Sequence, residues 1–318
     1  MNPNDVVMVG TLDLHPQDQR ANIQKLKETG ALIIVFGSQE SAIADIGDHL
    51  IENGLPAGIV PVMDIGNGNT IGPVAGIANV INKWVFTSEL VAALTRQGKM
   101  PSLWQSMFVT GAAKRNQGIE EIYYHDDMRI MPIEPRILGR QYLTAVTGYL
   151  EKMKANELPK FREAGDVLAA AAESDTEIVA GLIGHFMSSQ RRMEGFPNEL
   201  FTIRENMYGS DQLKDVLDSG DVWLHIGYSY YPVEELTYAK EQGATTIAVF
   251  TDGPTEVGEG PTVAPDLSLI DIYIDPYWEH GDAVVEVPDY DTDIIPPSGV
   301  LMGSSLWMIL GEMLASMD

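Results

Sequence analysis

The stretch "GDVWLHIGYSYYPVEELTYAKEQGATTIAVF" occupies residues 220–250 and predicts a buried strand, a turn, a helix and a second buried strand. Both apolar runs are short and contain β-branched residues, as buried strands do. Pro232 stands where a first helical residue belongs, and Gly243 stands where the helix is expected to stop. Strand, helix and strand in this order predict a parallel pair joined by a crossover helix. We therefore expect an α/β fold.

The same pattern occurs near the start of the chain, in "NDVVMVGTLDLHPQDQRANIQKLKETGALIIVF" at residues 4–36. A proline and a glycine again stand at the two ends of the helix. The likeness continues between residues 48–90 and residues 271–314, which both contain a short strand, a Gly-containing turn, a second apolar run and a long apolar helix after proline. Six elements repeated in one order indicate two copies of a single α/β module.

The two copies are unequal in length. Two further strands, at 177–183 and 200–204, precede the second copy, and two amphipathic helices, at 136–154 and 158–174, lie before them. Residues before the first copy offer no counterpart. We predict a three-layer αβα architecture with open, mostly parallel sheets of the flavodoxin or Rossmann type. The expected parts are a partial half-domain (1–100), a connector (101–135) and a near-complete domain (136–318).

Composition narrows the classes of partner. The chain has 318 residues, 45% of them hydrophobic, so a packed core is expected. Its net charge of −26 repels nucleic acid and anionic membranes. No uncharged run of membrane-spanning length and no leader pattern stands out. The absence of cysteine excludes disulfides and thiolate chemistry, and it fits a cytoplasmic protein.

Several short motifs resemble those of the SIS (sugar isomerase) phosphosugar-binding domain, and above all those of its poorly characterised bacterial branch. Gly281-Asp282-Ala283 matches the segment that follows the last strand there, and Pro297-Ser298-Gly299 matches the next helix start in part. Gly184-His185 stands at the place of a Gly-His pair after the first strand. The connector resembles the tail of that branch in the order of Pro101, Ser106, Gly111 and Asn116.

The resemblance implies an open five-stranded parallel sheet with ligands at the carboxyl ends of its strands, near a dimer interface. It implies a small phosphorylated sugar as ligand and a homo-oligomer, dimer or tetramer. The expected function is phosphosugar binding, with an aldose–ketose isomerase of sugar phosphates as the first reading. A non-catalytic sugar-phosphate-binding or assembly module is the alternative, and a sugar-phosphate lyase that cleaves an ether is the second alternative.

Hydroxyls and backbone N–H groups at helix starts are suited to holding phosphate. In "GYSYYP", Ser229 supplies a hydroxyl, with Tyr228 beside it, although Ser229 is equally a simple turn residue. After the strand at 177–183, Gly184 allows close backbone approach, and Ser188 and Ser189 follow it. Two further hydroxyls belong to the expected ligand set, one at a strand end and one at a helix start: Thr251 and Ser298.

Proton transfer between adjacent carbons needs a base and an acid. His185 is the first candidate because imidazole titrates near neutrality, although a lone histidine is more often structural. Glu279 and His280 are further candidates on an expected loop. His225 falls inside a strand and is expected to be a core residue. The sequence does not select one base among these candidates.

We expect neither a metal nor a cofactor. His125 stands beside two aspartates in "YYHDD", but no second histidine lies at a ligand spacing. The glycines of "GNGNTIGPVAG" lack the spacing of a dinucleotide site, and no nucleophile elbow occurs.

The loop of the first copy, "GTLDLHP", has Thr11 as its one hydroxyl, and Asp13 adds negative charge. A phosphate site is less expected there than a degenerate copy retained for packing or dimerisation. A three-stranded half-sheet also exposes an edge. We predict that the second domain, the connector or another protomer covers it.

Overall fold

The computed structural model describes residues 2–13, 15–58, 61–66, 69–174, 176–184, 201–205, 209–227, 231–251 and 264–317. The chain divides into two compact units, Met1–Trp84 and Val85–Asp318. The boundary between them lies inside one long helix, α2 (Val74–Thr95). The division into parts that the sequence suggested, with limits near residues 100 and 135, stays a prediction.

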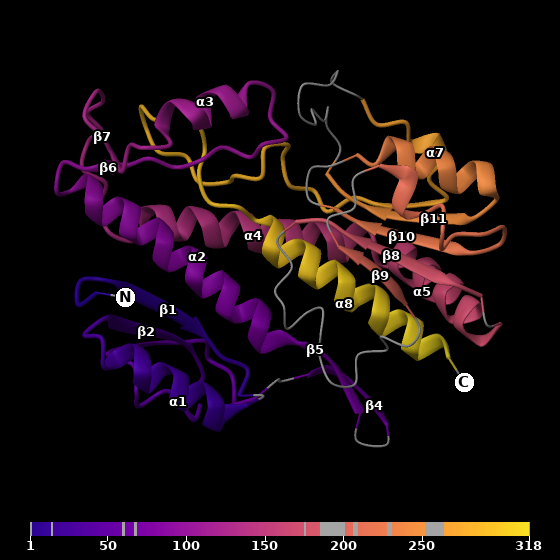
Figure 1. The fold of residues 1–318 in the computed structure, drawn as a ribbon, viewed down its shortest axis with the longest axis horizontal. Coiled ribbons are helices and arrows are strands. Elements are labelled where there is room, and N and C mark those ends of the chain that lie inside the picture. The colour runs from indigo at the N-terminus through magenta and orange to yellow at the C-terminus, as the bar shows by residue number, and fades with distance from the viewer. Residues whose placement is uncertain are drawn as a thin grey trace. The chain divides into compact units, whose positions relative to one another are not determined.

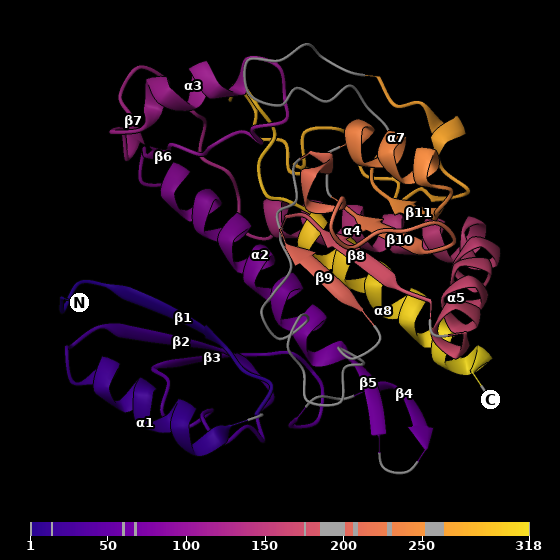
Figure 2. The ribbon, with the colours of Figure 1, turned by 45° about the vertical axis from the view of Figure 1, so that its right-hand side comes forward.

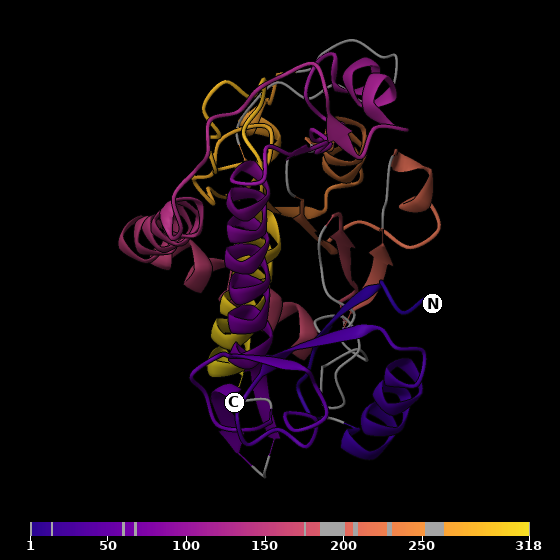
Figure 3. The same ribbon diagram turned by 90° about the vertical axis from the view of Figure 1, so that its left-hand side faces the viewer.

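The first unit contains a parallel sheet of three strands in the order β1-β2-β3, namely β1 (Val6–Gly10), β2 (Leu32–Gly37) and β3 (His49–Glu52). Helix α1 (Pro16–Lys27) lies along one face of this sheet (Figures 2 and 3). Ile23 of α1 packs there against Ile33 and Val35 of β2. The hairpin of β4 (Pro61–Gly66) and β5 (Asn69–Pro73) then leads into α2.

Strand β1 is an edge strand of this sheet. Two of its side chains, Val6 and Met8, are 54% and 44% exposed. Both point to the face opposite Val7 and Val9, which pack in the cluster that contains Ile23 of α1. The prediction that another element or another protomer covers this edge remains a prediction.

The second unit contains five parallel strands in the order β12-β11-β10-β8-β9. They are β8 (Ile178–Leu182), β9 (Thr202–Glu205), β10 (Val222–Ile226), β11 (Thr245–Val249) and β12 (Ile272–Ile274). Parallel sheets of three and five strands confirm the predicted α/β class. The strands at 177–183 and 200–204 are also confirmed, as β8 and β9.

Helices cover both faces of the five-stranded sheet. Helix α7 (Val233–Gln242) lies on one face, and α5 (Leu158–Glu173) and α8 (Ser298–Ser316) lie on the other (Figures 1 and 2). Helix α4 (Ile137–Asn156) precedes α5 and also contacts α8. Among the described residues, α8 is the one helix long and apolar enough to cross a membrane, and 72% of that stretch is buried inside the fold.

Helices α5 and α8 approach each other closely at Gly165. A Cβ atom built there would meet the backbone carbonyl carbon of Glu312 and the amide nitrogen of Met313 at 2.7 Å. No real Cβ contact is that short, so glycine is required where the two helices cross. The pair forms the most extensive helix–helix contact of the second unit.

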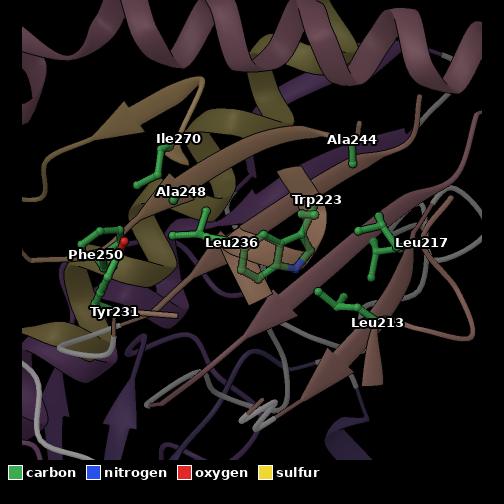
Figure 4. Close-up of a cluster of buried hydrophobic side chains, with 11 residues drawn as sticks. Leu213, Leu217, Trp223, Tyr231, Leu236, Ala244, Ala248, Phe250 and Ile270 are labelled. Carbon is green, nitrogen blue, oxygen red and sulfur yellow. The ribbon is translucent and has the colours of Figure 1, made fainter. Parts of the chain in front are cut away.

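The core beneath α7 is aromatic. Trp223 of β10 and Phe250 after β11 are buried there with Leu236 of α7, and Tyr231 lies against Phe250 (Figure 4). His225, 1% exposed, has its ring 5.5 Å from that of Trp223. It is therefore a core residue, as the sequence predicted.

The repeat holds at the level of strand register. Val6 pairs with Leu32 in the first sheet, and Val222 pairs with Thr245 in the second. Val6 and Val222 each follow the aspartate that precedes the first strand of their copy, and Leu32 and Thr245 each stand two residues after the glycine that ends the helix. The third strand of each copy also keeps its register, since β3 and β12 meet equivalent residues of β2 and β11. The two copies share one strand geometry.

A lysine–aspartate pair recurs with this register. Lys27 of α1 contacts Asp48, with 3.2 Å between Nζ and Oδ1, and Lys240 of α7 contacts Asp271 at 2.5 Å. The other carboxylate oxygen accepts the backbone N–H of the second residue of β2 in one copy (2.8 Å) and of β11 in the other (2.9 Å). Each aspartate thus fastens the last turn of its helix to the start of the central strand.

The connector folds within the second unit. It contains α3 (Ala112–Ile119) and a small antiparallel pair, β6 (Met100–Pro101) and β7 (Tyr124–His125). Gly111 adopts a φ of +83° at the start of α3, a conformation that favours glycine. Asn116 of α3 is buried and makes two hydrogen bonds to the backbone of Gln105.

Candidate functional site

The carboxyl ends of parallel strands meet at one edge of a sheet, where ligands gather in open α/β folds. At this edge Gly184 follows β8 with a φ of +105°, and Thr251 follows β11. The other residues predicted for these loops lie outside the described residues: His185, Ser188, Ser189, Tyr228 and Ser229. Their roles stay predictions.

The structure places Thr251 and Ser298 in buried positions. The hydroxyl of Thr251 donates to the backbone carbonyl of Trp278, and the residue is 3% exposed. Ser298 begins α8, and both its hydroxyl (2.7 Å) and its backbone N–H (3.1 Å) donate to the carboxylate of Asp282. In the described structure these two hydroxyls hold the segment after β12 in place.

Glu279 and His280 lie in that same segment. Glu279 is exposed, while His280 is half-buried with Nε2 3.2 Å from the backbone carbonyl of Phe108. Burial lowers the pKa of His280, although the bond to Phe108 opposes the shift. A carbonyl oxygen only accepts, so Nε2 carries the proton and Nδ1 keeps a lone pair. Nδ1 is buried and meets no hydrogen-bond partner among the described residues.

A cavity of about 290 Å³ lies between the connector and the segment after β12. The connector contributes Trp104 and Ser106, and the opposite wall includes Gly281 and Asp293. The remaining lining residues are Gln105, Met107, Asp282, Ala283, Ile294, Ile295 and Pro296. The Gly-Asp-Ala motif that carried the family resemblance therefore forms part of a cavity wall.

Two sets of contacts fasten the connector to this wall. The guanidinium of Arg115 makes two hydrogen bonds of 2.7 Å to the carboxylate of Asp291, and it also contacts the hydroxyl of Tyr290 at 3.2 Å. The side-chain amide of Gln105 donates to Thr292 at 3.2 Å. These contacts join residues more than 170 positions apart in sequence and fix the width of the cavity.

The wall after β12 is backbone-strained. Four non-glycine residues there adopt positive φ angles: Tyr277 (66°), Asp282 (52°), Asp289 (66°) and Ile295 (68°). Such conformations are uncommon outside glycine, and a β-branched residue such as Ile295 adopts them least readily. Strain of this kind collects at functional sites, where the surrounding packing maintains it.

Carboxylates and hydroxyls supply the polar groups of the cavity. Burial, followed by the charges of Glu279 and Asp293, raises the pKa of Tyr149 on α4. Burial and the charge of Asp282 likewise raise the pKa of Tyr142, whose hydroxyl lies 3.3 Å from the carbonyl of Pro296. No Lys or Arg stands among the described lining residues. This wall is thus suited to neutral hydroxyl groups rather than to an anion.

The connector brings an indole and a hydroxyl to the lining of the cavity. Trp104 is 65% exposed although it lines the cavity, and the buried hydroxyl of Ser106 makes no hydrogen bond in the described part of the chain. An exposed indole offers a face for the C–H groups of a ring, and the hydroxyl offers both a donor and an acceptor.

Sequence reasoning missed Trp104, Asp293 and Arg115 as contributors to this region. The connector has no periodic pattern, and only the family resemblance drew attention to Ser106. The one sequence signal was an aromatic residue in a polar, aperiodic segment. That signal does not say which part of the fold the residue faces.

The fold and the cavity define an α/β protein with parallel sheets and a ligand-sized hollow between the connector and the segment after β12. No family model and no curated protein matches the chain. Three solved structures are similar to it, each described in the words "putative phosphosugar isomerase": from Salmonella typhimurium LT2 (10% identity, TM-score 0.48), Bacillus subtilis (12%, 0.47) and Clostridium difficile 630 (10%, 0.44). The matches cover 98–99% of this chain and 71–74% of theirs.

Proposed function

We propose that the chain binds a small phosphorylated sugar at the carboxyl edge of its five-stranded sheet and interconverts the aldose and ketose forms of that sugar. The observation that carries the proposal is the cavity between the connector and the segment after β12. Its Trp104 face, Ser106 hydroxyl and Asp293 carboxylate suit a ring that bears hydroxyl groups.

The phosphate is assigned to a different part of the same edge. The described lining of the cavity holds two aspartates and would repel a dianion. The helix-start loops with Ser188, Ser189 and Ser229 are the proposed phosphate ligands, as the family resemblance implies.

Isomerisation requires a base that moves a proton between adjacent carbons. His280 has a neutral imidazole and directly precedes Gly281 of the cavity wall, and its Nδ1, which is buried in the described structure, would have to become exposed to the substrate for the transfer. His185 and Glu279 remain the other candidates from the sequence. We assign His280 to proton transfer in the proposed reaction.

A non-catalytic binding module is the second proposal. The hydroxyls of Thr251 and Ser298 both serve internal hydrogen bonds, so two of the expected substrate ligands are already engaged. A protein that binds a sugar phosphate without turnover would need fewer free polar groups at this edge of the sheet than an isomerase needs.

A panel of aldose and ketose phosphates separates these proposals. Thermal unfolding with each compound, and with its unphosphorylated parent, identifies a ligand. Incubation of that ligand in D₂O then reports deuterium incorporation at the carbon next to the carbonyl. Incorporation supports an isomerase, binding without incorporation supports the module, and the absence of any stabilisation contradicts both.

Two variants test the assigned residues. We expect Trp104→Ala to weaken binding about tenfold through the lost ring contact, while Tyr123→Ala, at an 87% exposed connector position outside the cavity lining, leaves binding unchanged. His280→Gln should abolish deuterium incorporation and leave binding intact. Equal losses for Trp104→Ala and Tyr123→Ala would contradict the assignment of the cavity.

A further inference from the structure

We propose that a second cavity, at the end of α2, binds a small phosphorylated molecule with a largely apolar or aromatic body. This cavity of about 390 Å³ lies in the second unit, between the last turn of α2 and the chain that follows β7. It shares no lining residue with the cavity described above. Its size is in the range of sites for small ligands.

The charge of this cavity opposes that of the whole chain. Arg96, Lys99 and Arg129 line it, against a single acidic residue, Asp126. The complete sequence contains 46 acidic and 20 basic residues. Three cations that converge on one hollow create a local positive field in a protein whose overall field is negative. Such a field is selective for an anion that can enter the cavity.

The fold does not neutralise these three charges. Arg96 donates to the backbone carbonyl of Ile133 at 2.7 Å, which fixes its position and leaves the charge in place. Lys99 lies over the ring of Tyr124, 5.2 Å from its centroid. Within the described part of the chain, no carboxylate lies within 4.0 Å of Arg96, Lys99 or Arg129. An anionic ligand would supply the missing counter-charge.

Helix capping explains only part of this arrangement. Cations near a helix C-terminus offset its partial negative charge of about half an elementary charge. Arg96 directly follows the last residue of α2, and Lys99 stands three residues further on. Arg129 belongs to the connector beyond β7 and reaches the same hollow from another segment. Three cations exceed what one helix end requires, and a phosphate dianion would use the surplus.

The remaining lining residues indicate what else the ligand carries. Met100 and Ile130 are 2% and 7% exposed and form an apolar wall, together with Met128 and Pro132, and the lining is completed by Thr95, Gly98 and His125. An apolar wall favours a flat or hydrophobic body over a ring that bears many hydroxyls. The preferred ligand therefore differs from the sugar phosphate of the proposed function, and adenosine monophosphate is a suitable probe.

Calorimetric titration with four compounds tests this proposal. We expect adenosine monophosphate to bind more tightly than inorganic phosphate or glucose 6-phosphate at this site, and adenosine to give no detectable binding. The affinity should fall as salt is raised, because charge attraction is screened. Absence of adenosine monophosphate binding to the wild-type chain would overturn the proposal.

Three variants test whether adenosine monophosphate binds in this cavity. Lys99→Gln and Arg129→Gln should each weaken adenosine monophosphate binding about tenfold, the scale of a charge-assisted hydrogen bond. Neither side chain makes a hydrogen bond within the described structure, so both variants should unfold at the wild-type temperature. Lys114→Gln, at an exposed lysine on α3, is the matched control and should change the affinity less than about twofold. Equal affinities in all three variants would refute the assignment.

Discussion

The two copies of the module share a scaffold and differ in the loop that follows their first strand. In the second copy this loop carries Ser229, and in the first copy Asp13 occupies the equivalent position. The carboxylate of Asp13 accepts the hydroxyl of Ser41 at 2.7 Å and the backbone N–H of Ala42 at 3.3 Å. A hydroxyl and an N–H are the groups that would hold a bound anion. In the first copy a carboxylate of the chain itself therefore engages these two donors.

The difference shows which features the scaffold requires. Strand register and the lysine–aspartate pair recur in both copies, because they connect each helix to its central strand. The loop chemistry does not recur, because the scaffold does not depend on it. That the first copy is less suited to phosphate than the second stays a prediction.

The largest expected effect on stability comes from a substitution at the crossing of α5 and α8 in the second unit. Gly165→Ala places a methyl group 2.6–2.7 Å from atoms of Glu312 and Met313, so α5 and α8 must separate. We expect the free energy of unfolding of the second unit to fall by about 3 kcal/mol. Hydrogen exchange followed by mass spectrometry should show faster exchange in β10 and β11, with β1 and β2 unchanged.

Gly148→Ala in α4 is the matched control for Gly165→Ala. A Cβ at Gly148 meets nothing within 4 Å, so the substitution should stabilise the helix by up to about 1 kcal/mol. Similar losses in the two variants would contradict the close crossing of α5 and α8.

The next largest effect concerns the loop after the first strand, in which the two copies differ. Asp13→Ala leaves the Ser41 hydroxyl and the Ala42 amide without their acceptor. We expect a loss of about 2 kcal/mol in urea unfolding. Asp13→Asn retains an acceptor oxygen and should keep most of that stability. Identical losses for Ala and Asn would show that these hydrogen bonds contribute little.

The recurring lysine–aspartate pair permits a direct comparison of the copies. Asp271→Ala should destabilise the protein by about 1 kcal/mol, and Asp48→Ala should act in the same direction. The effect at Asp271 should be the larger, because the hydroxyl of Thr246 also donates to it at 3.1 Å, whereas Ile33 in the first copy has no hydroxyl. Urea unfolding of both variants measures the difference, and the opposite order would contradict this account.

The same pair predicts a dependence on pH. The backbone N–H of Ile33 and then Lys27 lower the pKa of Asp48. At Asp271, burial opposes the shift, but the bonds from Lys240 and Thr246 outweigh it and lower the pKa. A lowered folded-state pKa contributes stability above the unfolded value of about 3.9, and this contribution is lost as the pH falls through the folded-state value. The loss should be smaller in Asp48→Asn and Asp271→Asn, which unfolding at pH 7 and pH 3 will measure.

The sequence determined the elements and the repeat. Strand and helix positions follow from local signals, such as apolar runs of strand length and the prolines and glycines at helix ends. These signals act within about ten residues of each other, and so a single sequence suffices to find them. The register does not follow from spacing alone, because three more residues separate Val6 from Gly30 than separate Val222 from Gly243, and yet the strands pair alike.

The tertiary structure alone decided what the connector does. The contact of Arg115 with Asp291 spans 176 positions, and no local pattern pairs two such residues among 46 acidic and 20 basic ones. That contact places Trp104 and Ser106 beside Gly281 and so creates the cavity. The fold also decided that the hydroxyls of Thr251 and Ser298 make internal hydrogen bonds. The partner of a buried hydroxyl depends on which distant backbone group or carboxylate lies next to it, and a single sequence does not show this.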